Sequence, residues 1–234
     1  MKIKHCPSYE ALSEQAQQLV SDYLLQNPSM LLCTATGASP VGTYEWMVRA
    51  AQEDPPAFSR LRIIKLDEWG GLPMTHPGSC ESFLQQHLVG PLGLTEDRYI
   101  SFQSNPSDPV AECERIQQAL SEQGPIDICI VGIGMNGHIA LNEPAPELWP
   151  HCHPAGLADT SLRHPMIAGS SEQPTYGLTL GMADILQAKK IILLACGAGK
   201  ETVIKDFLKG EISTALPASF LWLHPDVICL IDQT

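Results

Sequence analysis

Apolar and polar residues follow two different spacings along the chain. In residues 9–26 and 108–123, apolar side chains recur every three to four positions, which is the spacing of one buried helix face. Short apolar runs without alternation, typical of strands buried on both faces, cover residues 30–35, 61–66, 126–131, 190–195 and 227–231. The order of these segments predicts an α/β fold that is Rossmann-like, with a mostly parallel sheet and helices on both faces.

Shorter segments complete the predicted order of elements. A helix ending near Gln52 follows the first strand, and a lysine, Lys200, begins a helix after the fourth long strand. The pattern also predicts helices over residues 79–89, 182–187 and 217–224, and short strands over residues 99–102 and 175–180.

The composition indicates one domain over residues 1–234, because 44% of the 234 residues are hydrophobic. No apolar run approaches the roughly 18 residues of a membrane span, and no signal peptide is visible, so we expect a cytoplasmic protein. Eight scattered cysteines without a Cys-x-x-Cys pair indicate reduced thiols. His151 and His153 flank a cysteine, but consecutive positions of an extended chain point to opposite faces, and we expect no metal.

The formal net charge is −12, which argues against nucleic acid and anionic membranes as partners. We expect a small-molecule ligand instead. If that ligand is an anion such as a sugar phosphate, a helix N-terminus and one or two placed lysines can supply a local positive field. The oligomeric state stays open, with a homo-oligomer among the alternatives.

Residues 125–144 combine a buried strand with a glycine-rich turn. The three glycines of residues 132–137 let the backbone approach a ligand, and they deliver His138 and Glu143 beyond the carboxyl end of the strand. In open α/β sheets, ligands bind at that end. The turn formally matches the G-x-G-x-x-G pattern of dinucleotide-binding proteins. However, two prolines follow within a few residues and would stop the long helix that this pattern requires, so we reject a dinucleotide site.

A second turn of small residues, 36–44, links the first strand to the next helix. Ser39 is a good N-cap residue and Pro40 suits the first helical position, so free backbone N–H groups would point outward. Such a turn can bind an anion, although an ordinary strand-to-helix turn uses the same residues. Lys200 opposes the dipole of its helix, which either a bound anion or simple exposure to solvent would explain.

Two carboxylates, Asp67 and Glu68, follow the second long strand. Neighbouring side chains of a strand face opposite ways, so one of them can face a cleft, or both can be solvated at the strand end. Residues 148–175 have a weak pattern and are rich in His, Pro, Gly and Ser. This composition predicts either a lid over a site or an irregular excursion of the chain.

Three motifs, in this order, resemble those of the glucosamine-6-phosphate deaminase/isomerase family. They are Thr36-Gly-Ala-Ser-Pro with Gly42-Thr-Tyr, Leu66-Asp-Glu-Trp with Gly71-Leu-Pro, and Gly132-x-Gly-x-x-Gly-His-Ile-Ala-Leu-Asn-Glu-Pro. The closing segments Gly199-Lys and Ser219-Phe-Leu-Trp-Leu-His-Pro fit as well, so the resemblance covers nearly the whole chain. Within the family, the chain is most similar to the galactosamine-6-phosphate deaminase/isomerase branch.

The resemblance implies a reaction without a cofactor. The ring of galactosamine-6-phosphate opens, the aldose isomerises to a ketose through an enolamine, and tagatose-6-phosphate and ammonia are released. Carried over by motif, Asp67 is the base that moves a proton from the amine-bearing carbon to its neighbour. A carboxylate beside Trp69 would be partly desolvated and so a better base. His138 would move the proton between the ring oxygen and the anomeric hydroxyl, with Glu143 setting its tautomer.

The resemblance also implies a phosphate site. Its members are the backbone around Gly37, Ala38 and Ser39, together with Gly132 and the side chain of Lys200.

The chain departs from the family pattern at two positions. Asn136 stands where an aspartate usually precedes Gly-His, and its amide is polar but uncharged. Asn136 resembles the galactosamine branch, so we interpret it as a tuning residue of the catalytic group. The phosphate-binding arginine of the glucosamine enzymes falls near Met166 by spacing, and Arg163 is the candidate within reach.

Three alternatives remain beside the main reading. The nearest is glucosamine-6-phosphate deaminase, and a second is a 6-phosphogluconolactonase-like ester hydrolase, whose corresponding loop also carries Gly-His. The third is a sugar-phosphate sensor without catalysis. Asn142-Glu-Pro after the histidine favours the deaminases, and the joint presence of Asp67, His138 and Glu143 counts against a sensor.

Overall fold

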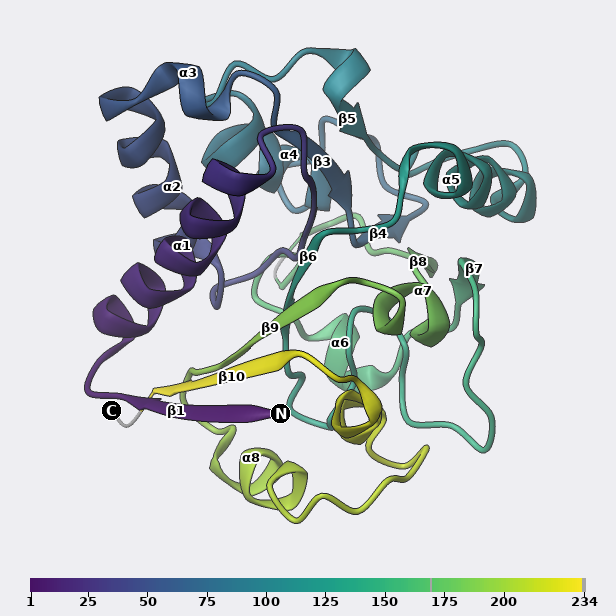
Figure 1. Cartoon of the computed structure of the whole chain (residues 1–234). Coiled ribbons are helices and arrows are strands. Elements are labelled where there is room, and N and C mark those ends of the chain that lie inside the picture. Colours follow the sequence, from purple (N-terminus) through teal and green to yellow (C-terminus); the bar gives the residue numbers. More distant parts are fainter. Residues whose placement is uncertain (169, 233–234) are drawn as a thin grey trace.

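A computed structural model describes residues 1–168 and 170–232. Within these ranges, seven parallel strands form a sheet in the order β1-β10-β9-β6-β2-β3-β5. They are β1 (Lys2–Cys6), β2 (Leu31–Thr34), β3 (Arg62–Lys65), β5 (Tyr99–Ile100), β6 (Ile128–Gly132), β9 (Lys190–Ala195) and β10 (Val227–Asp232). The predicted α/β fold with a mostly parallel sheet is confirmed (Figure 1).

Helices cover both faces of this sheet because successive strand residues point to opposite sides. Leu32 and Ile63 pack on one side, and their neighbours Cys33 and Ile64 pack on the other. The first side carries α1 (Tyr9–Gln26), α2 (Val41–Glu53), α3 (Pro55–Phe58), α4 (Cys80–Leu84) and the π-helical turn η1 (Gln85–Val89). The second side carries α5 (Pro109–Gln123), α7 (Met182–Leu186), α8 (Glu201–Phe207) and the 3₁₀ helix η3 (Pro217–Leu223).

Local capping explains why the two long amphipathic helices begin where the sequence predicts. The Ser8 hydroxyl accepts the N–H of Ala11 before α1, and the Asp108 carboxylate accepts the N–H groups of Val110 and Ala111 before α5. The predicted helix over residues 9–26 is confirmed with the same bounds.

A second, three-stranded antiparallel sheet was not predicted. It joins β4 (Asp67–Gly70) to β8 (Tyr176–Thr179) and β8 to β7 (His153–Ala155). Segment 148–175 therefore contains β7. After β7 the chain forms the short helix α6 (Asp159–Leu162) and then joins β8, which pairs with the strand of Asp67. The sequence prediction stopped the strand at residue 66, whereas the chain continues extended and pairs Asp67 with Thr179.

The edge strand β1 was also missed. Four of its five residues are exposed, so the segment carries no apolar run that would mark a strand. Another short 3₁₀ turn, η2 (Glu96–Arg98), precedes β5.

Candidate active site

The carboxyl ends of four parallel strands bring the predicted site residues to one edge of the sheet. Residues 37–39 follow β2, and Asp67 lies two residues beyond β3. His138 and Glu143 follow β6, and Lys200 follows β9. Because β9, β6, β2 and β3 are consecutive in the sheet, these groups occupy adjacent connections.

Asp67 is a buried carboxyl group, 8% exposed, at the start of β4. Burial and then the negative charge of Glu68 raise the pKa of Asp67 to about 7. The charges of His138 and Lys65 oppose this rise, as does the Cys80 thiol, whose sulfur is 3.9 Å from Oδ1 of Asp67. A carboxylate with a pKa near neutrality can both accept and return a proton.

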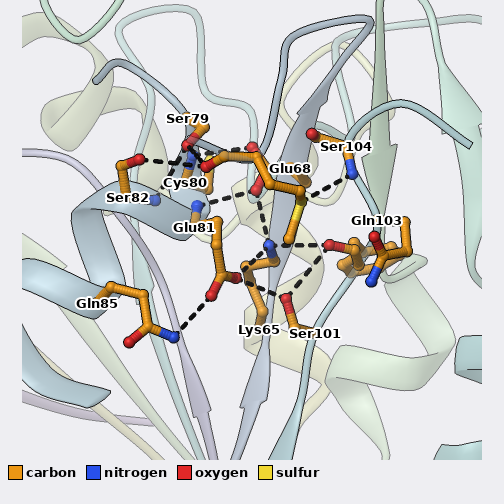
Figure 2. A network of polar contacts seen from close by, with 12 residues as sticks. Lys65, Glu68, Ser79, Cys80, Glu81, Ser82, Gln85, Ser101, Gln103 and Ser104 are labelled. Carbon is orange, nitrogen blue, oxygen red and sulfur yellow. Dashed lines mark hydrogen bonds and ion pairs between the residues drawn. The ribbon is translucent and has the colours of Figure 1, made fainter. Parts of the chain in front are cut away.

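A buried ion-pair network lies next to Asp67 in the sequence and is drawn in Figure 2. Nζ of the fully buried Lys65 is 2.7 Å from Oε2 of Glu68 and 2.9 Å from Oε2 of Glu81. It also donates to the Phe102 carbonyl at 3.1 Å. All three ammonium hydrogens therefore have acceptors, which offsets much of the cost of burying this charge.

Glu68 connects the start of β4 to the start of α4 by hydrogen bonds. Its carboxylate accepts the backbone N–H groups of Trp69, Cys80 and Glu81, at 2.8, 2.8 and 2.9 Å. Of the two sequence alternatives, a solvated acid pair is wrong, since both Asp67 and Glu68 are buried. The peptide that carries Asp67 is thereby held in place by its neighbour.

His138 and Glu143 lie close together in the loop after β6. Nδ1 of His138 is 3.3 Å from Oε2 of Glu143, which is ion-pair distance without the alignment of a hydrogen bond. Burial acts to raise the pKa of Glu143, but the contact with His138 and hydrogen bonds from Ser161 and Asn136 lower that pKa to about 2. Glu143 is therefore ionised at neutral pH and can orient the imidazole ring.

Asn136 links these two residues. Its Nδ2 donates to Oε2 of Glu143 at 2.8 Å, and its Oδ1 accepts the backbone N–H of His138 at 3.2 Å. An ionised aspartate could not donate to the Glu143 carboxylate, so the amide suits this arrangement. Asn136 thus supports the pair by hydrogen bonding where a carboxylate would act by charge.

Two glycines let the loop after β6 fold back toward the sheet. A Cβ atom on Gly134 would lie 2.4 Å from the His138 ring, so only glycine leaves room for the imidazole. Gly137 has a φ of +87°, in the left-handed region. In the described part of the chain, the next helix after β6 is α6, so the helix that a dinucleotide fingerprint needs does not follow this turn.

Ser39 and Lys200 face each other across the ends of β2 and β9. Nζ of Lys200 donates to Oγ of Ser39 at 3.4 Å, and a Cβ atom on Gly132 would lie 3.7 Å from the same hydroxyl. The prediction that Ser39 caps α2 is wrong, because Pro40 occupies the cap position and no side chain closes the helix end. The hydroxyl is thereby free to face Lys200, whose pKa is lowered by burial.

Tyr9 of α1 fixes the turn that precedes α2. Its hydroxyl accepts the N–H of Gly42 at 2.9 Å and donates to the Ala38 carbonyl at 2.9 Å. Gly37 has a φ of +92°, which favours glycine. The turn around residues 37–39 is therefore set before any ligand arrives.

Segment 148–175 is attached to the loop after β6 by hydrogen bonds that α6 forms. Ser161 donates a short hydrogen bond to Oε1 of Glu143, and Thr160 accepts one from Asn136 at 3.2 Å. The residues that hold His138 therefore also hold this segment.

Arg163, the predicted phosphate ligand of the segment, lies outside the group. Its side chain is exposed, and none of the described residues forms a hydrogen bond or ion pair with it. The next residue, His164, lies inside instead. Its Nε2 would be 3.3 Å from a Cβ atom on Gly37, and its ring centroid is 5.9 Å from that of Trp69.

No helix of residues 1–168 or 170–232 is long and apolar enough to cross a membrane. Over the same ranges, His, Cys, Asp and Glu side chains nowhere gather in threes as a metal site requires. All eight cysteines are unpaired.

The sequence resembles known proteins over its whole length. Residues 8–229 match the family described as glucosamine-6-phosphate isomerases/6-phosphogluconolactonase. The chain is 44% identical over 230 residues to AgaI of Escherichia coli (strain K12), whose name marks it as an inferred deaminase, and the match covers 98% of this chain and 91% of AgaI. It is 34% identical over 238 residues to glucosamine-6-phosphate deaminase 1 of Bacillus subtilis (strain 168), covering 100% and 97% of the two chains.

The fold of the chain is also similar to that of a solved structure. A solved structure described as a monomeric glucosamine-6-phosphate deaminase superposes on this chain with a TM-score of 0.93 at 34% identity. The superposition covers 100% of this chain and 98% of the other.

Proposed function

The chain belongs to the glucosamine-6-phosphate isomerase/6-phosphogluconolactonase family, and we propose that it converts galactosamine-6-phosphate to tagatose-6-phosphate and ammonia. One observation carries the proposal: β3 and β6 end at the same edge of the sheet, where the buried Asp67, with a pKa of about 7, and the pair of His138 and Glu143 follow them. A base and a proton shuttle at one sheet edge are what an aldose-ketose isomerisation needs.

Ring opening is the first step. His138 takes the proton of the anomeric hydroxyl and returns it to the ring oxygen as the ring carbon–oxygen bond breaks. Glu143 stays ionised throughout, because its pKa is about 2, and it holds the imidazole from the Nδ1 side. Asn136 fixes both partners through its amide.

Proton transfer at carbon is the second step. Asp67 removes the proton from the amine-bearing carbon of the open aldose, which gives an enolamine, and delivers a proton to the neighbouring carbon. The resulting imine takes up one water, and its carbon–nitrogen bond breaks to give the ketose and ammonia. Removal from water strengthens the Asp67 carboxylate as a base, which supports this role.

The phosphate group would lie at the opposite end of the substrate. We assign it to the turn of Gly37, Ala38 and Ser39, with Gly132 allowing close approach and Lys200 supplying positive charge. The 3.4 Å contact between Lys200 and Ser39 supports this grouping. Segment 148–175 would act as the lid over the site, since α6 forms hydrogen bonds with Glu143 and Asn136 of the loop after β6.

We base the choice of the galacto epimer on the motifs, which resemble those of the galactosamine branch. Asn136 supports this choice, because it stands where the glucosamine enzymes usually carry an aspartate. The chain is also less similar to the glucosamine-6-phosphate deaminase of Bacillus subtilis, at 34% identity, than to AgaI, at 44%.

Ammonia release from galactosamine-6-phosphate and glucosamine-6-phosphate at matched concentrations tests the proposal. We expect a higher kcat/KM for the galacto epimer. A higher value for the gluco epimer would retain the chemistry and refute the substrate, and it would favour glucosamine-6-phosphate deamination. The lactonase alternative predicts hydrolysis of 6-phosphogluconolactone, and the sensor alternative predicts binding of amino-sugar phosphates without turnover.

We place the enzyme in the cytoplasm. The eight unpaired cysteines support a reducing compartment, because thiols of this number would tend to oxidise elsewhere.

A further inference from the structure

His164 stands in the turn that follows α6, and its ring lies against the predicted phosphate turn. The edge carrying Nε2 and Cε1 would be 3.3 and 3.4 Å from a Cβ atom on Gly37. The other side of the ring packs toward Trp69, at a centroid distance of 5.9 Å and an interplanar angle of 45°. A residue of segment 148–175 therefore reaches the end of β2, although the two are distant in sequence.

The orientation of this ring is fixed by a backbone hydrogen bond. The N–H of Met166 donates to Nδ1 of His164 at 3.3 Å, so Nδ1 is an acceptor. In the neutral ring the proton must then be on Nε2. An N–H donor therefore lies against the turn of residues 37–39, which also carries the Ser39 hydroxyl that accepts from Lys200.

The charges around His164 indicate the sign of a ligand. Burial comes first in lowering the pKa of His164, followed by the positive charges of His138, after β6, and Lys200, after β9. The turn after β2 and Trp69 of β4 bring no charge. Three basic side chains thus converge where an anion would relieve their repulsion.

The geometry points to His164 as a phosphate ligand: Nε2–H donates to the phosphate group of the bound amino-sugar phosphate, beside Ser39 and Lys200. This inference rests on the proposed function and extends it to the lid. It places recognition of the phosphate on the same segment that Glu143 and Asn136 hold through Ser161 and Thr160.

The test is His164→Phe, which keeps a ring for packing on Trp69 and removes the N–H donor. A hydrogen bond to a charged group suggests a rise in KM of about tenfold to a hundredfold. We expect kcat to change less than twofold. His164→Gln retains an N–H donor and should recover part of the loss. His87→Phe is the matched control, since this half-buried histidine of η1 packs against the Phe83 ring, with ring centroids 4.6 Å apart, and is not a member of the site.

The comparison of variants separates a ligand from a packing residue. Because Nδ1 accepts the Met166 N–H and burial lowers the pKa of His164, the neutral ring donates through Nε2. The ratio of the KM of His164→Phe to that of the wild type should therefore stay at about tenfold or more from pH 6 to pH 8. A ratio near one, or a His164→Gln variant worse than His164→Phe, would overturn the inference in favour of packing.

Calorimetry in the Asp67→Asn background distinguishes this inference from the proposed function. If the wild type releases no ammonia but His164→Phe weakens the binding of galactosamine-6-phosphate tenfold, the proposed function fails and the ligand role stands. If the wild type releases ammonia and His164→Phe binds normally, the ligand role alone fails. A loss of affinity in Arg163→Gln but not in His164→Phe would assign the role to Arg163 instead.

Discussion

Removing the negative charge of Glu68 should change the pH dependence of proton transfer at Asp67 without touching the substrate. After burial, the charge of Glu68 is the largest influence that raises the pKa of Asp67 to about 7. In Glu68→Gln that pKa should fall. Because Asp67 must be ionised to act as a base, the acid limb of the kcat/KM profile should move to lower pH.

The size of the shift follows from the electrostatic repulsion between the two carboxylates. A like charge in the same buried site raises a carboxyl pKa by about one unit or more, so we expect the limb to move by about one pH unit. At pH 6, roughly a tenth of Asp67 is ionised when its pKa is 7, and about half when its pKa is 6. Relative to its own plateau, the variant should therefore be about fivefold more active than the wild type at pH 6.

A matched control separates charge from structure. Glu81 is the second partner of Lys65, at 2.9 Å, but it is not among the main influences on the pKa of Asp67. Both Glu68→Gln and Glu81→Gln weaken the ion-pair network of Figure 2, and each should lower the melting temperature. Glu68→Gln alone should move the acid limb.

The assay is ammonia release at pH 5 to 9, with kcat/KM fitted at each pH. An acid limb that stays in place in Glu68→Gln would refute the assignment of that limb to Asp67. Equal shifts in both variants would show that damage to the network, and not the charge of Glu68, sets the profile.

Three further variants test the site. Asp67→Asn should abolish ammonia release. The pKa of Asp67 in the folded protein, about 7, exceeds the ordinary aspartate value of 3.8, so ionisation of Asp67 lowers the stability of the wild type as the pH rises. The gain in melting temperature of Asp67→Asn over the wild type should therefore grow from pH 5 to pH 8. Asn136→Asp puts a second carboxylate at the 2.8 Å contact with Glu143. Because the two negative charges repel each other, kcat/KM should fall about tenfold at pH 8 and less at pH 6, which pH profiles would show. Gly134→Ala puts a Cβ atom 2.4 Å from the His138 ring, so kcat should fall about a hundredfold while calorimetric melting changes by only a few degrees.

The parallel sheet could be predicted because its signal is local. Strands such as β6 and β9 are buried on both faces and read as continuous apolar runs, and α1 has a regular apolar face and a serine cap. The small sheet of β4, β8 and β7 could not be predicted in this way. Its pairing of Asp67 with Thr179 joins segments far apart in sequence, and no local pattern specifies such a partner.

In the candidate site, the residues that follow strands could be predicted, whereas their side-chain partners could not. Asp67, His138, Glu143 and Lys200 follow predicted strands, so the topology alone brings them to one edge. The pairing of Lys65 with Glu68 and Glu81 was missed, because a lysine inside an apolar run gives no sign of its partners.

His164 was missed for another reason. Arg163 was chosen by its charge, but the direction of a side chain in an irregular segment depends on the turn that carries it. The sequence held one signal, a histidine next to the candidate arginine, in a segment for which a lid was one of two predicted alternatives. Only the contact with Gly37 shows which of the two residues turns inward.

The most direct test of the proposed deamination, with Asp67 as its base, measures ammonia and ketose together, from galactosamine-6-phosphate, with the wild type and with Asp67→Asn. We expect one ammonia for each tagatose-6-phosphate from the wild type, and a rate lower by at least about a hundredfold in the variant. Calorimetric binding of the substrate by the variant should be retained. Ammonia release by Asp67→Asn at the wild-type rate, or none by the wild type from either epimer, would contradict this proposal.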